Sequence, residues 1–268
     1  MGAPSGSLQS LSAFFPAYND AESLRTLIPR ALDTLNRLGG EFEIIVVDDG
    51  STDHTAEVLD TLQREIPCLR VVRHPRNLGY GAALQSGFRA AGKELVFYTD
   101  GDGQYDVQEL SALVGGLSAD REVVNGYKIR RADSFARTLA GKAYQSLVKI
   151  LFRLRIKDVD CDFRLLRRQV VEAVPLSCRS GAICVELMAQ VERAGFRVAE
   201  VPVHHYARRA GKSQFFHWGP VARTLRDLLR LWIRLVVLKR GLTPQVVGSS
   251  KVTSSRFPDP EQRYKAGA

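Results

Sequence analysis

The amino-acid sequence predicts an α/β fold, in which helices flank a mostly parallel sheet. Strand-like and helix-like segments alternate between residues 11 and 125, a pattern typical of parallel strands joined by right-handed helical crossovers. The run Ile-Ile-Val-Val at residues 44–47 has no polar alternation, which indicates a strand buried on both faces. With 268 residues, 45% of them hydrophobic, the chain can build such a core.

The expected elements can be assigned in order along the chain. Five strands are expected in the alternating part, at residues 11–15, 42–48, 69–73, 95–99 and 122–125. The helices expected between them lie at residues 22–37, 52–63, 79–91 and 107–117. After Tyr127 the alternation ends, and the remaining elements are a strand at 161–166, a helix at 183–194, a strand at 197–201 that ends at Pro202, a polar loop at 204–214 and a helix at 219–238.

These elements divide the chain into one domain and its attachments. Residues 11–215 are expected to form the domain, which includes a basic amphipathic insertion at 128–157. Residues 216–240 are expected to add a further amphipathic helix. The N-terminus at 1–10 and the tail at 241–268 are rich in small and polar residues, so we expect both to be flexible.

The positive charge is concentrated in the two amphipathic segments. The net charge is +9, but residues 128–157 carry +8 and residues 221–240 carry +5, so the rest of the chain is mildly acidic. In the second segment four arginines recur every three or four residues, which predicts one basic helix face: Arg223, Arg226, Arg230 and Arg234. Arginines beside apolar side chains suit an anionic membrane surface. A helix packed on its own domain with a solvated basic face is the alternative, and no nucleic-acid-binding motif accompanies the charge.

Polar clusters follow each of the first four expected strands. They are Pro16-Ala-Tyr-Asn-Asp20, Asp48-Asp-Gly-Ser-Thr-Asp53, Arg76-Asn-Leu-Gly79 and Asp100-Gly-Asp-Gly-Gln104. Ligands bind at the carboxyl ends of the strands in a parallel α/β sheet. Because all four clusters fall at that edge, the sequence predicts a ligand site there.

Two acidic stretches carry the expected chemistry. Asp100 and Asp102 repel each other unless a cation lies beside them, and Mg²⁺ or Mn²⁺ takes such carboxylates together with phosphate oxygens. Gln104 can supply a third oxygen, although an ordinary Asp-Gly turn is the alternative. Asp158, Asp160 and Asp162 alternate with apolar residues, so an extended strand would place their three carboxylates on one face.

Phe15-Pro-Ala-Tyr-Asn, Val47-Asp-Asp-Gly-Ser-Thr-Asp53, Asn77-Leu-Gly79 and Asp100-Gly-Asp102 occur in the order and spacing of family-2 glycosyltransferases. The chain therefore resembles enzymes with the Rossmann-like GT-A fold over roughly residues 10–215. Two later stretches are similar to the polyprenol-phosphate branch, which includes the dolichol-phosphate mannose synthase-like enzymes: Asp158-Val-Asp-Cys-Asp-Phe-Arg164, and Glu200-Val-Pro-Val203 followed by His205, Arg208, Gly211 and Ser213.

The resemblance implies a role for many of these positions. The implied donor-binding residues are Pro16, Tyr18, Asp20, Val47, Asp49, Asp100, Gly101, Asp102, Arg130 and Arg208. The implied ligands of Mg²⁺ or Mn²⁺ are Asp100, Asp102 and Gln104, and the implied catalytic residues are Asp158, Asp160 and Arg164. Lys212 would join Arg208 in a loop over the donor diphosphate. The chain departs from the family pattern at Asp20, Asp162 and Gln214, where the family more often has Glu, a small residue and a basic residue.

The resemblance also implies the reaction: inverting transfer of a sugar from GDP-mannose or a UDP-hexose to polyprenyl or dolichyl phosphate. An acceptor phosphate is already anionic near neutral pH, so it needs positioning more than a general base. The sequence has no signal peptide and no apolar run of ~18 residues. We therefore expect a cytoplasmic protein, peripheral on the cytoplasmic face of the membrane, alone or with a membrane-protein partner. A family-2 enzyme with a glycan or glycolipid acceptor and a non-catalytic membrane scaffold are the alternatives.

Overall fold

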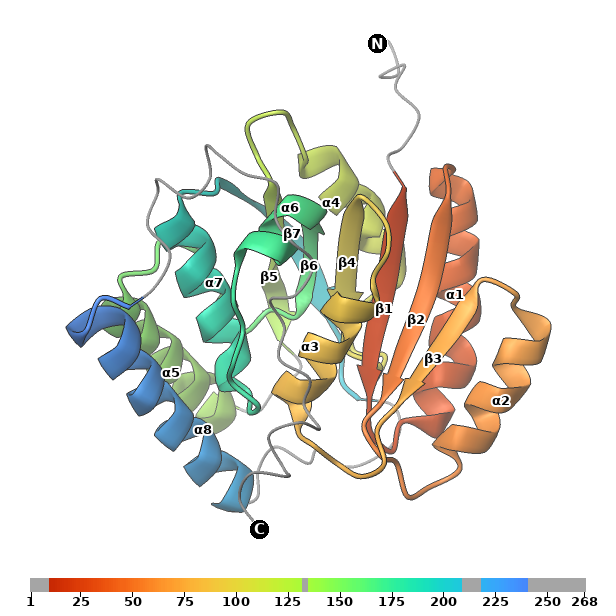
Figure 1. The fold of residues 1–268 in the computed structure, drawn as a ribbon, viewed down its shortest axis with the longest axis horizontal. Helices are drawn as coiled ribbons and strands as arrows, with labels where there is room; N and C mark the ends of the chain where they lie inside the picture. Colours follow the sequence, from red (N-terminus) through yellow and green to blue (C-terminus); the bar gives the residue numbers. More distant parts are fainter. Residues whose placement is uncertain (1–9, 132–134, 209–217, 241–268) are drawn as a thin grey trace.

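A seven-stranded sheet in the order β3-β2-β1-β4-β6-β5-β7 forms the centre of the protein (Figure 1). The computed structural model describes residues 10–131, 135–208 and 218–240. The strands are β1 (Leu11–Ala17), β2 (Phe42–Asp48), β3 (Leu69–Arg73), β4 (Leu95–Thr99), β5 (Val123–Arg131), β6 (Phe163–Arg167) and β7 (Val198–His205). The helices are α1 (Ala21–Leu38), α2 (Thr55–Glu65), α3 (Tyr80–Ala90), α4 (Leu110–Gly116), α5 (Phe135–Phe152), α6 (Arg168–Ala173), α7 (Ala182–Ala194) and α8 (Trp218–Trp232), with a 3-10 turn at Val107–Glu109 and a π-turn at Ile233–Val237.

Helices cover both faces of this sheet, which confirms the predicted α/β class. The helices α1, α2 and α4 pack on one face, over a core that includes Phe15 and Phe97. The helices α3, α6 and α7 pack on the other face, over a core that includes Phe14 and Tyr98. Neighbouring residues of β1 thus enter opposite cores, as the alternation of side chains along a strand requires.

The first four strands are parallel to one another. β1 pairs with both β2 and β4, and β2 pairs with β3. Residues 44–47 of β2 have no exposed surface, as expected for a strand covered on both faces. The parallel arrangement brings the carboxyl ends of these strands, and the polar clusters that follow them, to one edge of the sheet.

The second half of the sheet is mixed, because β6 is antiparallel to both β4 and β5. β5 and β7 pair in parallel and are longer than the sequence predicts. β7 was expected to end at Pro202 but continues to His205, into the predicted polar loop. As the outermost strand, β7 tolerates a proline whose missing N–H would have faced away from the sheet.

The acidic stretch at 158–162 is a turn and not part of a strand, so the prediction of one shared face is wrong. The Asp158 carboxylate accepts a hydrogen bond from the backbone N–H of Asp160 at 3.1 Å, and β6 begins only at Phe163. A hydrogen bond from an aspartate side chain to the backbone N–H two residues later favours a turn, and it competes with the backbone hydrogen bonds of a strand. The short helix α6 that follows β6 was not predicted either.

The basic face predicted for the C-terminal helix is divided between the core and the surface. Leu231 and Leu235 are buried, and Arg234 lies beside them and bonds the fully buried carboxylate of Glu186 on α7. That carboxylate also accepts from the backbone N–H groups of Ser177 and Cys178. Arg234 turns inward because a buried carboxylate requires a cationic partner. The other three arginines of the face, Arg223, Arg226 and Arg230, are exposed.

Candidate active site

The loop after β1 is fastened to the loop after β2. The side-chain oxygen of Asn19 accepts a bond from the Thr52 N–H at 2.8 Å, and the Asn19 N–H donates to the Ser51 hydroxyl at 3.0 Å. Asn19 has a positive φ of 56°, which asparagine tolerates better than most residues. The Asp20 N–H donates to the Thr55 hydroxyl at 3.1 Å. These bonds fix the segment that carries Pro16, Tyr18 and Asp20 at the sheet edge.

Asp49 holds the loop that precedes α3. Its two carboxylate oxygens accept the backbone N–H groups of Leu78 and Gly79, each at 2.9 Å. His74 lies 2.6 Å from the same carboxylate and 2.9 Å from the Ser86 hydroxyl. The resemblance implies that Asp49 contacts the base or ribose. In this structure its carboxylate also braces the third of the four predicted loops.

Asp100 and Asp102 follow β4 with Gly101 between them. The Gly101 N–H donates to the Pro16 carbonyl at 2.9 Å, and a Cβ at Gly101 would meet that same oxygen at 2.9 Å. The Tyr80 hydroxyl donates to Asp100 at 2.7 Å. Burial raises the pKa of Asp100 well above its usual range, and the carboxylates of Asp162 and Asp102 raise it further. The pair is therefore held in a close-packed turn that gathers negative charge.

Arg208 bridges two carboxylates of this edge. Its Nη2 donates to Asp102 at 2.8 Å, and its Nη1 lies 3.8 Å from Asp20. The Asp20 oxygen that faces Arg208 is buried and has no hydrogen-bond partner among the described residues. Burial raises the pKa of Asp20 to about 6, against the lowering effects of the Tyr18 N–H and of Arg208. The structure thus brings together Asp20, Asp102 and Arg208, three residues for which the resemblance implies donor binding.

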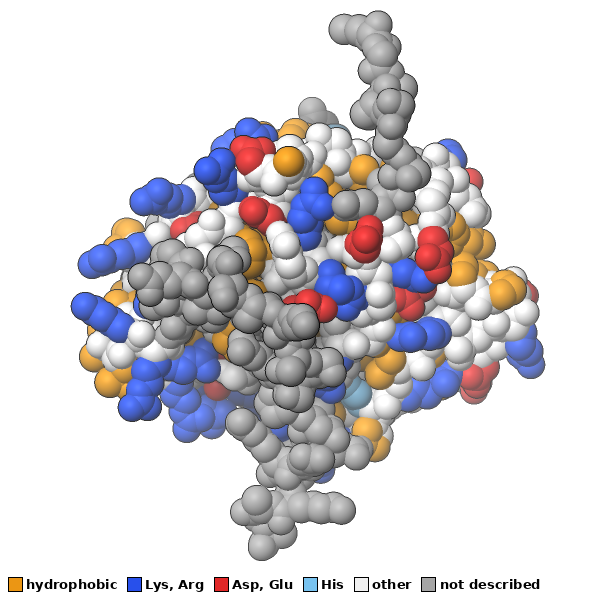
Figure 2. All heavy atoms as spheres, turned by 45° about the horizontal axis from the view of Figure 1, so that its top comes forward, with side chains coloured by type: hydrophobic (Ala, Val, Ile, Leu, Met, Phe, Trp, Pro, Cys, Tyr) orange, Lys and Arg blue, Asp and Glu red, His pale blue; other side chains and the backbone are white. Residues whose placement is uncertain are grey.

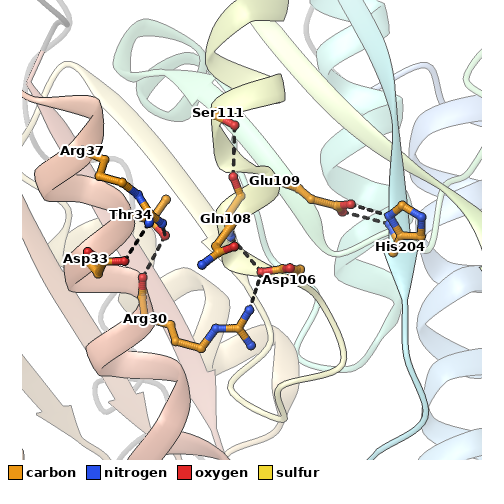
Figure 3. A network of polar contacts seen from close by, with 9 residues as sticks. All are labelled: Arg30, Asp33, Thr34, Arg37, Asp106, Gln108, Glu109, Ser111 and His204. Atoms are coloured by element: carbon orange, nitrogen blue, oxygen red, sulfur yellow. Dashed lines mark hydrogen bonds and ion pairs between the residues drawn. The ribbon is translucent and has the colours of Figure 1, made fainter.

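The segment that carries Arg208 is paired with the segment after Asp102. The Gln104 side chain donates to the Tyr206 carbonyl at 2.9 Å, and the Tyr206 N–H donates back to the Gln104 carbonyl at 2.8 Å. Glu109 binds both the N–H and the ring of His204 (Figure 3). On the other side Arg30 of α1 bonds Asp106 at 2.9 Å (Figure 3). Gln104, predicted as a metal ligand, therefore uses its amide nitrogen to hold β7 and keeps its amide oxygen as the remaining acceptor.

Asp158 and Asp160 form a second group of carboxylates. Asp158 is buried and accepts from the Gln145 amide of α5 at 2.5 Å, and its carbonyl accepts from Asn125 at 2.9 Å. Burial raises the pKa of Asp160 to about 7, although Lys128 lowers it, and the carboxylates of Asp158 and Asp162 raise it further. Asp160 therefore changes protonation near neutral pH, whereas Asp158 is fixed by bonds within the protein.

Arg164 is a brace beneath this turn. Its side chain has no exposed surface and donates to Asn125 at 2.7 Å, to the Val159 carbonyl at 2.5 Å and to the Tyr98 hydroxyl. Asp162 lies 3.6 Å from the same guanidinium. A buried side chain acts on a substrate only through its neighbours. We therefore describe Arg164 as a positioning residue, although the sequence suggested a catalytic role.

The two groups of carboxylates meet at Asp162 and Lys128. Asp162 raises the pKa of both Asp100 and Asp160, and Lys128 lowers both. The Lys128 ammonium also donates to the Asp160 carbonyl at 2.7 Å. Asp162 and Lys128 therefore influence the carboxylates of both groups.

Some site residues could not be assigned a role from sequence: Tyr80, Tyr98, Asn125, Lys128, Gln145, Tyr206. Lys128 was visible only as one charge of a basic segment, and the other residues belong to no recognisable sequence motif.

Two residues that the resemblance implies for donor binding, Val47 and Arg130, have no described side chain at the site. Val47 is fully buried in β2, so its side chain offers no surface to a donor. Arg130 lies in β5 opposite His204, but its side chain, like Lys212 and the termini at 1–9 and 241–268, is outside the described part of the chain.

Asp100 and Asp102 are the side chains that fit a divalent metal ion. Within residues 10–131, 135–208 and 218–240 no three His, Cys, Asp or Glu side chains converge into a complete metal cluster. Mg²⁺ commonly uses only one or two carboxylates when substrate phosphates supply the other oxygens. Burial and the neighbouring carboxylates of Asp162 and Asp102 disfavour a charged Asp100, and a cation beside this pair would offset that cost. The buried Asp20 oxygen has no hydrogen-bond partner among the described residues.

A family model described as glycosyl transferase family 2 matches residues 12–174, the stretch that holds most of this site. The chain belongs to this family. It is a glycosyltransferase. The match ends before α7, β7 and α8, so it includes Asp100 and Asp102 but not Arg208.

Solved structures similar to this family-2 glycosyltransferase include complexes of glucosyl-3-phosphoglycerate synthase from Mycobacterium tuberculosis. The complex with Mn²⁺, UDP-glucose and phosphoglyceric acid has a TM-score of 0.64 at 18% identity, over 84% of this chain and 79% of that chain. The complex with Mn²⁺, UDP and glucosyl-3-phosphoglycerate has a TM-score of 0.62 at 16% identity, over 87% and 85%. The complex with Mg²⁺ and UDP has a TM-score of 0.62 at 17% identity, over 84% and 78%. At these identities the likeness establishes the GT-A-like fold.

Proposed function

We propose that this glycosyltransferase moves a hexose from a GDP- or UDP-sugar to a polyprenyl phosphate at a membrane surface, with inversion at the anomeric carbon. The observation that carries the membrane part is the apolar surface exposed on α5 and α8. α5 contacts the second group of carboxylates directly, because its Gln145 bonds Asp158. The acceptor phosphate would therefore reach the site from the side on which the two helices lie.

The donor half of the site supports the first step. Asp100 and Asp102 would hold a divalent ion, which offsets charge on the diphosphate leaving group. Arg208, 2.8 Å from Asp102, is close enough to turn toward the same diphosphate. Tyr18 and Asp20 are fastened where the resemblance implies a nucleobase. Their positions do not distinguish guanine from uracil, so both donor classes enter the experiment.

The other half of the site supports a phosphate acceptor. The Lys128 ammonium bonds the Asp160 carbonyl at 2.7 Å and lowers the pKa of both Asp100 and Asp160. A cation at that position would attract the phosphate, while its anionic oxygen attacks without prior deprotonation. Asp160, whose pKa is raised to about 7, can accept or donate a hydrogen bond to a sugar hydroxyl. Arg164 would keep this turn in place from below.

The surface of α5 and α8 supports a lipid-bound acceptor. Ile150 on α5 is 74% exposed, and Leu225 and Leu229 on α8 are 59% and 58% exposed. Lys and Arg side chains, with hydrophobic side chains between them, gather on the side of the molecule where these helices lie (Figures 1 and 2). Leucines that dip below lipid headgroups, with arginines at the phosphates, are the arrangement of an interfacial helix. No helix among the described residues is long and apolar enough to cross a membrane.

A transfer assay with defined donors and acceptors tests the reaction. The protein would be incubated with Mn²⁺ or Mg²⁺, with labelled GDP-mannose, UDP-glucose or UDP-N-acetylglucosamine, and with either polyprenyl phosphate or phosphoglyceric acid. Label in the lipid phase is the expected result. If the label enters only phosphoglyceric acid, the molecule bound in one of the similar structures, the acceptor is a small phosphorylated molecule and not a lipid. No transfer to either would favour the glycan or glycolipid alternative, and no metal-dependent use of any donor would leave the scaffold alternative.

A separate experiment tests the membrane surface. The fraction of protein that sediments with vesicles containing anionic phospholipid is measured. It is expected to be high for the wild type and lower for the double variants Leu225→Ser/Leu229→Ser and Arg226→Gln/Arg230→Gln. The loss for the arginines should be about 1 kcal/mol per residue. Arg25→Gln on α1, which is exposed and removes the same charge elsewhere, is the matched control. Equal sedimentation of all variants would contradict the assignment to α8. Binding that appeared only with a membrane protein would point to the predicted partner instead.

A further inference from the structure

We propose that Arg208 is the internal counter-ion of the donor site before a donor binds, and that it competes with the metal ion for Asp102. This inference rests on the proposed donor site, and it adds that the binding of the metal ion and of the nucleoside diphosphate are coupled. The metal would bind weakly alone and tightly once a nucleoside diphosphate is present, because the diphosphate gives the displaced guanidinium a new anionic partner.

The first argument is the position of the guanidinium. Its Nη2 lies 2.8 Å from the Asp102 carboxylate, which is a direct, charge-assisted hydrogen bond. A metal ion on that oxygen and the arginine hydrogen bond to it would use the same acceptor. The Arg208 side chain is 24% exposed, so it can leave this contact without being extracted from a core.

The second argument is the attachment of the segment. Tyr105 and His205 form an antiparallel bridge, and Gln104 and Tyr206 exchange two hydrogen bonds. The backbone two residues before Arg208 is therefore fixed to the backbone two residues after Asp102. The backbone that leads to each of the two side chains is thus held in place by hydrogen bonds that neither side chain makes.

The third argument is the local charge. Two carboxylates contact the guanidinium, Asp102 at 2.8 Å and Asp20 at 3.8 Å, and Asp100 adds to the negative charge nearby. One positive charge leaves this group negative, and the Asp20 oxygen that faces Arg208 is buried without a hydrogen-bond partner among the described residues. A divalent ion offsets one more charge than arginine does. The exchange nevertheless breaks the hydrogen bond between Arg208 and Asp102, and a diphosphate offsets that loss because it gives the released guanidinium a new anionic partner.

Mn²⁺ binding without turnover tests the inference. The electron paramagnetic resonance signal of free Mn²⁺ would be titrated with the wild type and with Arg208→Gln, first alone and then with UDP or GDP. We expect Arg208→Gln to bind Mn²⁺ alone between about 5- and 150-fold more tightly than the wild type. The nucleotide should strengthen Mn²⁺ binding strongly in the wild type and much less in the variant.

Three controls keep the outcome clear. Arg208→Lys retains a cation and should resemble the wild type, and Arg25→Gln removes a charge from an exposed site on α1. Asp102→Asn should weaken Mn²⁺ binding in every background. If the wild type binds Mn²⁺ with a nucleotide but Arg208→Gln binds Mn²⁺ alone no more tightly, the exchange is refuted and the donor site stands. If no variant binds Mn²⁺ even with a nucleotide, both are refuted.

Discussion

Two arginines serve the two halves of the site in different ways. Arg164, in the half formed by β5 and β6, has no exposed surface and is bonded to a side-chain amide, a hydroxyl and a backbone carbonyl. Arg208, in the donor half, is partly exposed and contacts carboxylates that a ligand would also contact. The first arginine is part of the fold, and the second is available for exchange.

This difference shows how the site separates rigidity from ligand binding. The turn that carries Asp158 and Asp160 is stabilised by bonds within the protein before any substrate arrives. The donor edge keeps an excess of negative charge and an unsatisfied buried oxygen, both of which a cation would relieve. Four variants test the comparison between the two halves.

Arg164→Met should have the largest effect on stability. It leaves several buried polar groups without a partner, so we expect a loss of about 3–5 kcal/mol in the free energy of unfolding. Denaturation by guanidinium chloride measures it. The matched variant is Arg208→Met, which should cost less than Arg164→Met because the Arg208 side chain is 24% exposed and its printed partners are two carboxylates rather than several buried groups of the fold. Similar losses in the two variants would remove the distinction between a structural and an exchangeable arginine.

Asp102→Asn should have the largest effect on activity at an unchanged fold. It halves the pair of metal-binding carboxylates, and we expect turnover to fall by about 10²–10³-fold, the scale reported for losing one group that stabilises developing charge. Steady-state transfer with saturating donor measures this loss. Asp33→Asn on the exposed face of α1 is the control. Turnover within a few-fold of the wild type would show that the donor half works without this metal ligand.

Asp160→Asn should change the pH dependence of stability. Burial raises the pKa of Asp160 from 3.8 to about 7 in the folded protein, so folding favours the protonated form. The wild type therefore loses stability as the pH rises from about 4 toward 7, and the variant lacks that loss. At about 1.4 kcal/mol per pKa unit, this shift predicts that the stability of Asp160→Asn relative to the wild type rises by roughly 4 kcal/mol between pH 4 and pH 8. If the difference in stability between the two proteins stays constant across this pH range, burial does not raise the pKa of Asp160.

Arg30→Gln should have the smallest effect. It breaks the ion pair between α1 and Asp106 on the donor side, which is largely exposed (Figure 3). We expect less than about 1 kcal/mol in unfolding free energy and unchanged kcat and KM. Thermal melting and transfer kinetics check both. A clear fall in kcat would mean that α1, and not only β7, positions the segment after Asp102.

The donor half was largely predictable because its signals are local. Asp100-Gly-Asp102 directly follows a buried strand, and parallel pairing brings that strand end beside those of β1 and β2. The half around Asp160 was less predictable. Its turn replaces the expected strand, and its brace depends on Asn125 and Tyr98, which lie 39 and 66 residues from Arg164 in sequence. Glu186 could equally have been a solvated helix residue until the structure buried it against Arg234.

By itself the sequence determined the α/β fold, the edge that holds the site and the family, because strand periodicity and contiguous polar clusters are properties of short segments. Only the tertiary structure decided which charged side chains face a ligand and which face each other. The reason is that burial and pairing are set by residues far apart along the chain. Arg164 and Arg208 look alike in the sequence, and the contacts around each side chain make one a brace and the other a candidate for exchange with a metal ion.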